Sequence, residues 1–404
     1  MEEKRNVPKL RFPGFTDSWE QRRLGEIGSV AMCKRVYKDQ TTEAGDVPFF
    51  KIGTFGGEPD AFISNELFEK YRELYSFPKV GDILISAAGT IGRTIVYQGE
   101  RAYYQDSNIV WLNHDERLDN SFFLQYLNNQ TWSSLEGSTL KRLYNKDILD
   151  ANIALPKPDE QHRIGALFRK LDSLIALHQR ELDHVKELKK GLLQKMFPKE
   201  GTNVPELRFP GFTDPWEQRR LGEVAHRVTR KNEEGMSDLP LTISAQHGLV
   251  DQRDFFNSQV ASRDMRGYYL LERGEFAYNK STSSDSPWGA IKRLTEYEKG
   301  CLSTLYICFG LDEGDPDFLV TYYETSRWHR GIRMIAAEGA RNHGLLNIAP
   351  GDFFETELTL PGKIEEQTAI GALFAKLDSL IALHQRELDH VKELKKGLLQ
   401  QMFV

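Results

Sequence analysis

The sequence predicts an α+β protein: two mixed α/β globular domains separated by two long helices, which form an antiparallel intramolecular coiled coil with pseudo-two-fold symmetry. The first observation behind this prediction is a repeat, in which residues 7–27 recur almost unchanged at 204–224. The second is another repeat, in which residues 165–194 recur at 371–400 with a single change. Internal repeats of this kind fix the architecture of a chain.

The third observation is that the stretches between the repeats, residues 31–155 and 229–361, share almost no sequence with each other. We call the repeated segments the frame and the stretches between them the inserts. Uniform drift after a duplication would have changed the frame as well as the inserts. Two copies of one frame with unlike inserts therefore predict two different recognition surfaces held by the same scaffold.

The second frame repeat predicts the long helices. Both copies are rich in Leu, Lys, Glu and Gln, which are good helix formers, and neither contains Pro. Apolar residues and one His recur at steps of three and four, which is the pattern of a coiled-coil seam. In the first copy this seam consists of Leu171, Ile175, His178, Leu182, Val185, Leu188 and Leu192. One chain holds both copies, so an intramolecular pair is favoured over a coiled coil between two chains, and His178 and His384 are interpreted as polar register markers rather than ligands.

The inserts predict mixed α/β structure. Residues 81–112 and 274–294 alternate β-branched and polar residues between glycines, as short strands do, and 301–311 follows the same pattern. Residues 121–135 and 318–335 are predicted to be helical. Each insert closes on a strand-like run that ends in Leu-Pro, at 151–156 and at 355–361. The sequence thus predicts four segments, with boundaries at 1–156, 157–198, 199–361 and 362–404.

Composition and charge exclude several classes of protein. The N-terminus MEEKRNVPKL has no apolar signal segment, no apolar run approaches the ~20 residues that span a membrane, and the three cysteines form no CxxC pair, so we expect a cytoplasmic protein without a metal site. The formal net charge is −6. The inserts are acidic as well, with 13 Lys and Arg against 17 Asp and Glu in the first, and 14 against 20 in the second. DNA binding would therefore depend on local basic clusters, on neutral polar contacts or on a partner subunit.

The sequence lacks the motifs of an enzyme. It contains no GxxxxGK, HExxH, GxSxG or CxxC, and GTIGRT at 89–94 lacks the lysine of a phosphate loop. Asp159 and Glu160 stand where a helix begins and are interpreted as acids favoured by the helix dipole. We therefore expect no catalytic residues and no cofactor.

Two kinds of polar segment recur at matching places in the inserts and are the candidate DNA contacts. One kind is basic, and Arg, Lys and Asn can bind guanine or adenine edges with two hydrogen bonds. The other is rich in hydroxyl and amide groups, which suit phosphate oxygens. The candidate residues are Ser86, Thr90, Arg93, Lys141, Arg142, Asn145 and Lys146 in the first insert, and Asn279, Lys280, Ser281, Arg327, Arg330, Arg341, Asn342 and His343 in the second.

With these features together, the chain resembles the specificity subunits of type I restriction-modification systems. The resemblance is carried by RFPGFTDSWEQRRLGE and RFPGFTDPWEQRRLGE, by GDILISAAGTIG, and by the duplicated KLDSLIALHQRELDHVKELKKGLLQ. It implies that residues 1–156 and 199–361 are target recognition domains that each read half of a bipartite DNA sequence. It also implies that residues 157–198 and 362–404 are the conserved helical regions that set the spacer.

The resemblance further implies a subunit without a catalytic site. Its partners would be double-stranded DNA, two modification subunits that methylate adenine with S-adenosylmethionine, and, through them, restriction subunits that use ATP. The family fixes no base-reading residues, so the candidates above come from the residues alone. A different class, a scaffold that joins two protein partners without touching DNA, stays open at this point, and a fused methyltransferase or nuclease ranks behind it because the motifs are missing.

Overall fold

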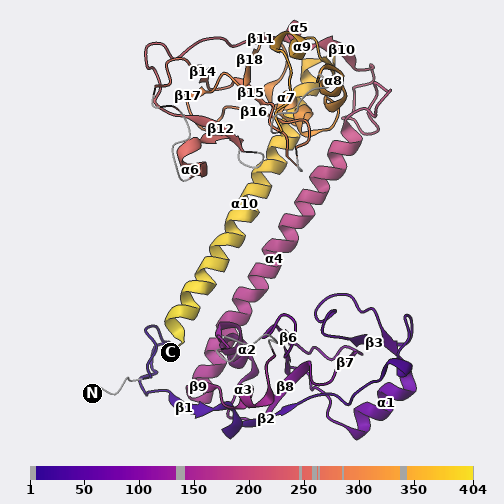
Figure 1. Ribbon diagram of the computed structural model, residues 1–404, viewed down its shortest axis with the longest axis vertical. Coiled ribbons are helices and arrows are strands. Elements are labelled where there is room, and N and C mark those ends of the chain that lie inside the picture. The colour runs from indigo at the N-terminus through magenta and orange to yellow at the C-terminus, as the bar shows by residue number, and fades with distance from the viewer. Residues whose placement is uncertain are drawn as a thin grey trace. The chain divides into compact units, whose positions relative to one another are not determined.

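The computed structural model describes residues 6–132, 142–244, 248–256, 262, 264–283, 286–336 and 344–403. These residues form two compact units: residues 1–179 with 386–404, and residues 180–385. Each long helix contributes one half to each unit, because α4 (Pro158–Met196) and α10 (Ile364–Met402) both cross the boundary between them. Each unit is therefore built around one half of α4 and one half of α10 (Figure 1).

Unit 1 contains a four-stranded antiparallel sheet in the order β2-β8-β5-β6, a three-stranded sheet in the order β4-β3-β7, and the pair β1-β9. Its elements before α4 are β1 (Glu20–Arg23), η1 (Leu24–Glu26), β2 (Gly28–Ala31), η2 (Lys38–Gln40), β3 (Val47–Phe50), β4 (Phe62–Ile63), α1 (Asn65–Leu74), β5 (Ile83–Ser86), β6 (Thr94–Val96), β7 (Tyr103–Tyr104), β8 (Ile109–His114), α2 (Asn120–Asn129), α3 (Asn145–Leu149) and β9 (Asn152–Leu155).

Unit 2 repeats the four-stranded sheet as β11-β18-β15-β16 and the closing pair as β10-β19, but replaces the three-stranded sheet by the pairs β12-β13 and β14-β17. Its elements before α10 are β10 (Glu217–Arg220), α5 (Leu221–Val224), β11 (Ala225–Arg227), β12 (Leu241–Ser244), β13 (Gly248–Asp251), α6 (Gln252–Phe256), β14 (Tyr269–Glu272), β15 (Phe276–Asn279), β16 (Ala290–Arg293), β17 (Lys299–Leu302), β18 (Ile307–Leu311), α7 (Pro316–Glu324), α8 (His329–Ile335), α9 (Pro350–Phe354) and β19 (Glu357–Leu360).

The main core of each unit lies where the four-stranded sheet, the first frame repeat and the two helix halves meet. In unit 1, Phe403 stacks on Phe122 with ring centroids 5.2 Å apart, and Trp19 packs edge-on against both rings. In unit 2, Phe197 stacks on Phe318 at 5.7 Å, and Trp216 packs edge-on against that pair. Burial of such aromatic side chains dominates core stability. The same arrangement therefore forms from each copy of the frame.

Within each unit the two helix halves run antiparallel. In unit 1, Lys395 of α10 binds Asp172 of α4 at 2.6 Å, and His178 lies 3.4 Å from Glu387. Moving towards the C-terminus of α4 thus means moving towards the N-terminus of α10, as an antiparallel pair requires. Unit 2 shows the equivalent contacts, Lys189 with Asp378 and His384 with Glu181. The predicted α+β class and packed helix pair are confirmed.

Most predicted elements are confirmed: the strands expected at 81–112, 274–294 and 301–311 are present, as are β9 and β19 before the two Pro residues. One helix prediction was wrong. The run 318–335 is broken into α7 and α8, because the Thr325 hydroxyl donates to the carbonyl of Tyr322 and accepts from the backbone N–H of Arg327. A hydroxyl that bonds the local backbone competes with helix continuation. The helix expected at 121–135 forms over Asn120–Asn129, and residues 133–135 lie outside the described part of the chain.

Candidate nucleic-acid interface

The turn that joins β5 to β6 is organised by Ser86. The Ser86 side chain is buried, and its hydroxyl donates to the carbonyl of Thr90 while accepting from the backbone N–H of Arg93 at 2.9 Å. The prediction that Ser86 is offered to DNA is therefore not supported by its position, since its hydroxyl is used within the turn. Thr90 and Arg93 are exposed at the same turn, and Arg93 makes one hydrogen bond from its guanidinium to the carbonyl of Gly56 at 3.1 Å.

The basic segment of the first insert returns to this turn. The backbone N–H of Leu143 donates to the carbonyl of Ala87 at 2.8 Å, directly after β5. Arg142 is half-buried and donates to the carbonyl of Ser107 at 2.8 Å, whereas Asn145 and Lys146 are exposed in the first turn of α3. Lys141 lies outside the described residues. The structure therefore brings both kinds of candidate segment to one end of the four-stranded sheet in unit 1.

Unit 2 repeats this arrangement with different residues. The turn between β15 and β16 begins at Asn279, whose side-chain oxygen accepts from the backbone N–H of Ser281 at 3.0 Å. Beside it, the backbone N–H of Thr282 donates to the carbonyl of Gly344 at 2.6 Å, so the segment after residues 337–343 runs along the turn. Arg341, Asn342 and His343 themselves lie outside the described residues.

Lys280 differs from its exposed neighbour Ser281. Its ammonium group lies 3.5 Å from the carbonyl of Ile348, and burial lowers the pKa of its side chain below the usual value of 10.5. It is therefore directed partly into the protein, which weakens its case as a phosphate contact. Ser281 is exposed and stands opposite Leu345 in an isolated antiparallel bridge.

Two glycines allow these turns to pass close to other groups. Gly92 has φ +79°, and a Cβ there would lie 2.8 Å from the indole nitrogen of Trp132. Gly289 has φ +81°, and a Cβ there would lie 2.1 Å from the carbonyl oxygen of Asn279. Positive φ and close approach both require glycine. Each turn is thus held in one conformation by its surroundings.

Arg327 and Arg330 bind groups other than the turn at β15. They line a hollow of about 920 Å³ beside the linker that follows α4. Arg330 pairs with Glu200 at 3.2 Å, and Arg327 lies 3.5 Å from the carbonyl of Phe197. Among the described residues, no recorded hydrogen bond or ion pair joins either arginine to residues 279–283. The grouping of these arginines with the basic loop stays a prediction, because residues 337–343 lie outside the described part of the chain.

The sequence reasoning missed a buried ion pair in the frame of each unit. Arg11 binds Glu160 with two hydrogen bonds of 2.8 and 2.7 Å, and the Glu160 side chain is only 1% exposed. Arg208 binds Glu366 in the same way in unit 2. Glu160 is thus more than an acid at a helix start. The signal in the sequence was that Arg11 recurs as Arg208 within the frame, and that the Glu-Gln pair at 160–161 recurs at 366–367 just before the second frame repeat.

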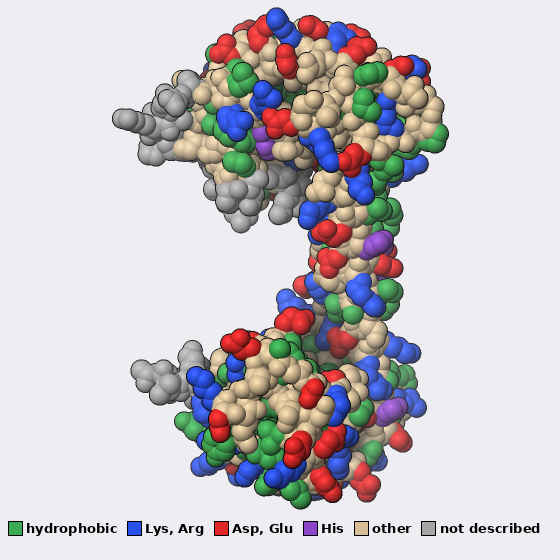
Figure 2. Space-filling view, turned by 90° about the vertical axis from the view of Figure 1, so that its right-hand side faces the viewer, with side chains coloured by type: hydrophobic (Ala, Val, Ile, Leu, Met, Phe, Trp, Pro, Cys, Tyr) green, Lys and Arg blue, Asp and Glu red, His purple; other side chains and the backbone are tan. Residues whose placement is uncertain are grey.

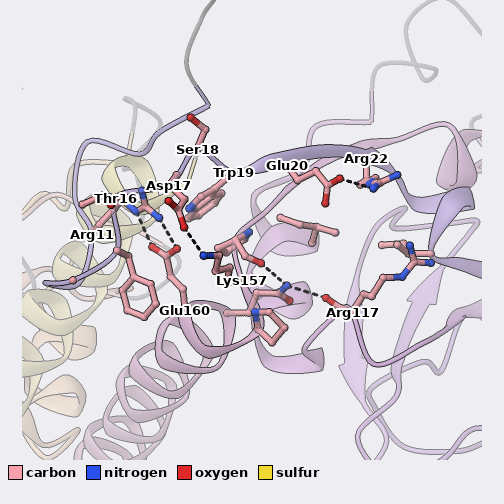
Figure 3. A pocket seen from close by; sticks show the side chains of 17 residues that line it. Arg11, Thr16, Asp17, Ser18, Trp19, Glu20, Arg22, Arg117, Lys157 and Glu160 are labelled. Carbon is pink, nitrogen blue, oxygen red and sulfur yellow. Dashed lines mark hydrogen bonds and ion pairs between the residues drawn. The ribbon is translucent and has the colours of Figure 1, made fainter.

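Figure 3 shows the hollow of about 460 Å³ around this ion pair, with Arg11 and Glu160 joined by dashed lines and Lys157 joined to Asp17. The carboxylate raises the pKa of the Arg11 guanidinium through its hydrogen bonds. Gln161, next to Glu160, accepts from the backbone N–H of Asp119 and donates to the carbonyl of Pro156. Since Asp119 caps α2, this glutamine links the start of α4 to the insert.

The exposed charges are of mixed sign, and the cysteines are buried. On the face in Figure 2, acidic and basic side chains are interspersed over both globular parts, without a single large basic area. Cys33 and Cys308 are buried, and burial raises the pKa of each thiol to about 12, where it is a poor nucleophile. Within either unit taken by itself, the described residues hold no group of three His, Cys, Asp or Glu ligand atoms near enough to bind a metal ion.

Comparison with known proteins shows which family the chain resembles. Residues 16–187 match the family described as the type I restriction modification DNA specificity domain. A type I restriction enzyme specificity subunit of Haemophilus influenzae is 52% identical over 152 residues, which is 37% of this chain and 40% of that protein. The type I restriction enzyme MjaVIII specificity subunit of Methanocaldococcus jannaschii is 24% identical over 154 residues, or 37% of this chain and 34% of that protein.

The fold is shared over the whole chain with a solved structure, the S subunit of a type I restriction-modification system from M. genitalium. The TM-score is 0.66 at 15% identity, covering 98% of this chain and 99% of that one. The match to the two curated relatives spans less than half of their length. The chain is similar to type I restriction-modification specificity subunits, and the family match covers residues 16–187. None of the helices in the described residues is both long enough and apolar enough to cross a bilayer.

Proposed function

We propose that this chain is the DNA-reading subunit of a type I restriction-modification complex, with each insert reading one half of a bipartite sequence. The observation that carries the proposal is the repeated arrangement at the β5–β6 and β15–β16 turns. Both turns stand at the same place in equivalent sheets, and each is joined by a polar segment from later in its insert, yet their residues differ. One scaffold with two unlike turns is what two independent half-sites require.

Exchange of one insert tests this proposal. Replacing residues 229–361 with the insert of a relative should change one half of the methylated motif and leave the other half intact. The reciprocal exchange of residues 31–155 is the matched control and should change only the other half. Methylome sequencing of cells that carry each chimaera reads both outcomes. A motif in which both halves change together after a single exchange contradicts the modular reading.

This chain would have no catalytic activity and no cofactor of its own, and it would act in the cytoplasm. Methyl transfer from S-adenosylmethionine would belong to two modification subunits, and ATP-driven cleavage to restriction subunits attached through them. Partner subunits would also supply phosphate contacts that an acidic chain lacks. Methylation of DNA by the purified chain alone, free of other subunits, would refute this division of work.

Exposed apolar side chains support the docking of two identical partners. In unit 1, Leu174, Leu177 and Leu394 are 42%, 41% and 45% exposed. Their equivalents in unit 2, Leu380, Leu383 and Leu188, are 42%, 41% and 46% exposed. Exposed apolar side chains on helices suit contacts with other proteins, and the same set present twice fits one kind of partner bound twice.

Removal of one apolar surface tests the partner proposal. Changing Leu174 and Leu177 to Gln should leave a complex with one modification subunit in place of two, measured by mass photometry. The same change at Leu380 and Leu383 is the matched variant, and all four together should release both subunits.

The alternative function is a scaffold that joins other proteins without reading DNA. It predicts that the intact complex shows no sequence preference in gel shifts.

A further inference from the structure

Unit 2 contains a basic hollow. It measures about 380 Å³ and lies between the C-terminal half of α4, the end of α7 and one residue of α10. Its charged lining consists of four cations and one carboxylate, namely Lys186, Lys189, Lys190, Arg327 and Glu324. The three lysines stand at i, i+3 and i+4, so they share one face of α4.

The lysines of this hollow have different roles. Lys189 is mostly buried and bound by Asp378 at 2.5 Å and by Glu324 at 2.7 Å. Burial alone would lower its pKa, but the two carboxylates raise it by more, so Lys189 is charged and already neutralised. Lys186 is exposed and has no recorded ion pair among the described residues. Lys190 lies 3.6 Å from Glu187, with the side chains 65% and 74% exposed, and such surface pairs contribute little.

A chain of contacts links the hollow to the strand that leads into the β15–β16 turn. The chain leaves the hollow at Arg327 and continues to Trp328, whose ring packs edge-on against Tyr278 with centroids 6.0 Å apart. Tyr278 directly precedes Asn279, where the turn begins. The segment that lines the hollow is therefore packed against the strand that leads into the candidate DNA-reading turn.

Unit 1 holds the same lysines. Lys392, Lys395 and Lys396 of α10 repeat the spacing, and Lys395 is bound by Asp172 at 2.6 Å as Lys189 is by Asp378. Lys392 and Lys396 are exposed. Trp132, which follows α2 as Trp328 follows α7, packs against Gly92 of the β5–β6 turn. A basic helix face with the same lysine spacing is thus present in both units.

We propose that the exposed lysine pairs Lys186/Lys190 and Lys392/Lys396 bind phosphates of the DNA where it continues inward from each half-site. The inference rests on the proposed function, since it takes DNA to be bound at the two turns. Flexible ammonium groups without base-edge geometry suit phosphate oxygens, and such contacts fix the position of the protein on the duplex without carrying sequence information. The paired helices would then hold the spacer DNA as well as set its length.

The test is the salt dependence of DNA binding by the assembled complex. Each phosphate contact contributes roughly 0.9 to the slope of log K against log salt. Changing Lys186 and Lys190 to Gln should lower that slope by roughly 1 to 2, weaken specific and non-specific DNA alike, and leave the methylated motif unchanged. The pair Lys392 and Lys396 should behave in the same way.

Lys170 and Lys376 provide the matched control. They are exposed, lie on the same helices and stand sixteen residues before Lys186 and Lys392, which turns them roughly 160° away from the proposed face. Changing both to Gln removes the same two charges and should leave the slope unchanged. A duplex that carries neutral methylphosphonates in the spacer should reduce the salt slope of the wild-type protein by the same amount. It should not reduce the slope of the lysine variants any further.

The outcomes separate this inference from the function on which it rests. A wild-type complex that prefers no sequence overturns the proposed function. A complex that keeps its motif but shows equal slopes for the lysine variants and the control overturns the lysine contacts alone. Loss of modification subunits from the Lys186/Lys190 variant, measured by size exclusion, would mean that the hollow binds an acidic surface of a protein, which also overturns the inference.

Discussion

Arg11 holds the buried carboxylate of Glu160 through two parallel hydrogen bonds, from Nε to Oε1 at 2.8 Å and from Nη2 to Oε2 at 2.7 Å (Figure 3). The pair ties the N-terminal segment of the frame to the first turn of α4. Arg208 and Glu366 tie the equivalent segment to α10 at 2.8 and 2.6 Å. Planar guanidinium–carboxylate pairs combine charge with fixed geometry. Each pair would therefore fix the orientation of its helix relative to the frame segment to which it is tied.

Breaking this pair should destabilise the unit that contains it. Arg11→Met leaves a carboxylate buried without its partner, and loss of one member of a buried pair typically costs about 3–5 kcal/mol. We expect a clearly lower urea midpoint for unit 1. Arg22→Met is the control, because Arg22 pairs with Glu20 and Glu26 at the exposed surface and should change stability by less than about 1 kcal/mol. Equal midpoints for the two variants would contradict a structural role of the pair.

Substitutions at different positions of the β5–β6 turn should affect stability and DNA binding separately. Ser86→Ala removes the acceptor of the Arg93 backbone N–H inside the turn and should lower stability by about 1–3 kcal/mol, measured by urea unfolding. Thr90→Ala with Arg93→Gln should keep stability and weaken DNA binding by about 1–3 kcal/mol if either side chain contacts a base. Relaxation of one motif position would then appear in the methylome. If Thr90 and Arg93 can be replaced without any change in affinity or motif, this turn does not contact DNA.

The paired helices should set the distance between the two half-sites. A seven-residue insertion after both Val185 and Val391 preserves the seam, because apolar positions recur at steps of three and four. It lengthens each helix by roughly 10 Å, which corresponds to about 3 bp of DNA. The methylated motif should keep both half-sites and gain a longer spacer, provided that partner subunits tolerate the accompanying rotation.

A single insertion is the control for this experiment. Seven residues after Val185 alone would misalign contacts such as Lys189 with Asp378 and should destabilise the subunit. The ruler is disproved by a folded and active double-insertion variant whose spacer has not changed. The helices would then act only as a tether.

Joining the chain ends should be tolerated, because unit 1 brings them together. The backbone N–H of Leu10 donates to the carbonyl of Gln401 at 2.9 Å, and the equivalent bond in unit 2, from Leu207 to Lys195, has the same length. In unit 2 the equivalent segments, around Lys195 and Leu207, are joined directly by residues 196–206 of the chain. A permuted protein with Phe403 joined to Val7 through a copy of residues 198–203, and opened between Glu200 and Gly201, should therefore fold and methylate the same motif.

The opening site in this permutation affects surface contacts: the ion pair of Arg330 with Glu200, that of Lys199 with Glu206, and the hydrogen bonds from Thr202 to the carbonyl of Lys199. Opening the same circular chain between Leu182 and Asp183 is the matched control. It interrupts α4 beside the buried Leu182, removes helix hydrogen bonds and should prevent folding. Similar thermal stability of the two permuted proteins would show that the continuity of α4 is dispensable.

The sequence by itself determined the architecture. Two frame copies, a seam of apolar residues and two unlike inserts are local patterns, so the helices α4 and α10 and most strands followed from residues close together in the chain. The absence of catalytic motifs and the acidic charge were also readable without a structure. Even the hydroxyl-rich turn and the basic segment were recognised, because each carries a composition of its own.

Only the tertiary structure decided how distant residues meet. The turn after β5 and the segment at Leu143 are more than fifty residues apart, and their contact depends on sheet pairing that periodicity does not encode. Ser86 turned inward and Arg330 turned to Glu200, because hydrogen bonds within the folded chain compete for groups that look free in a sequence. Arg11 and Glu160 are 149 residues apart, and only folding removes water from their ion pair and makes it structural.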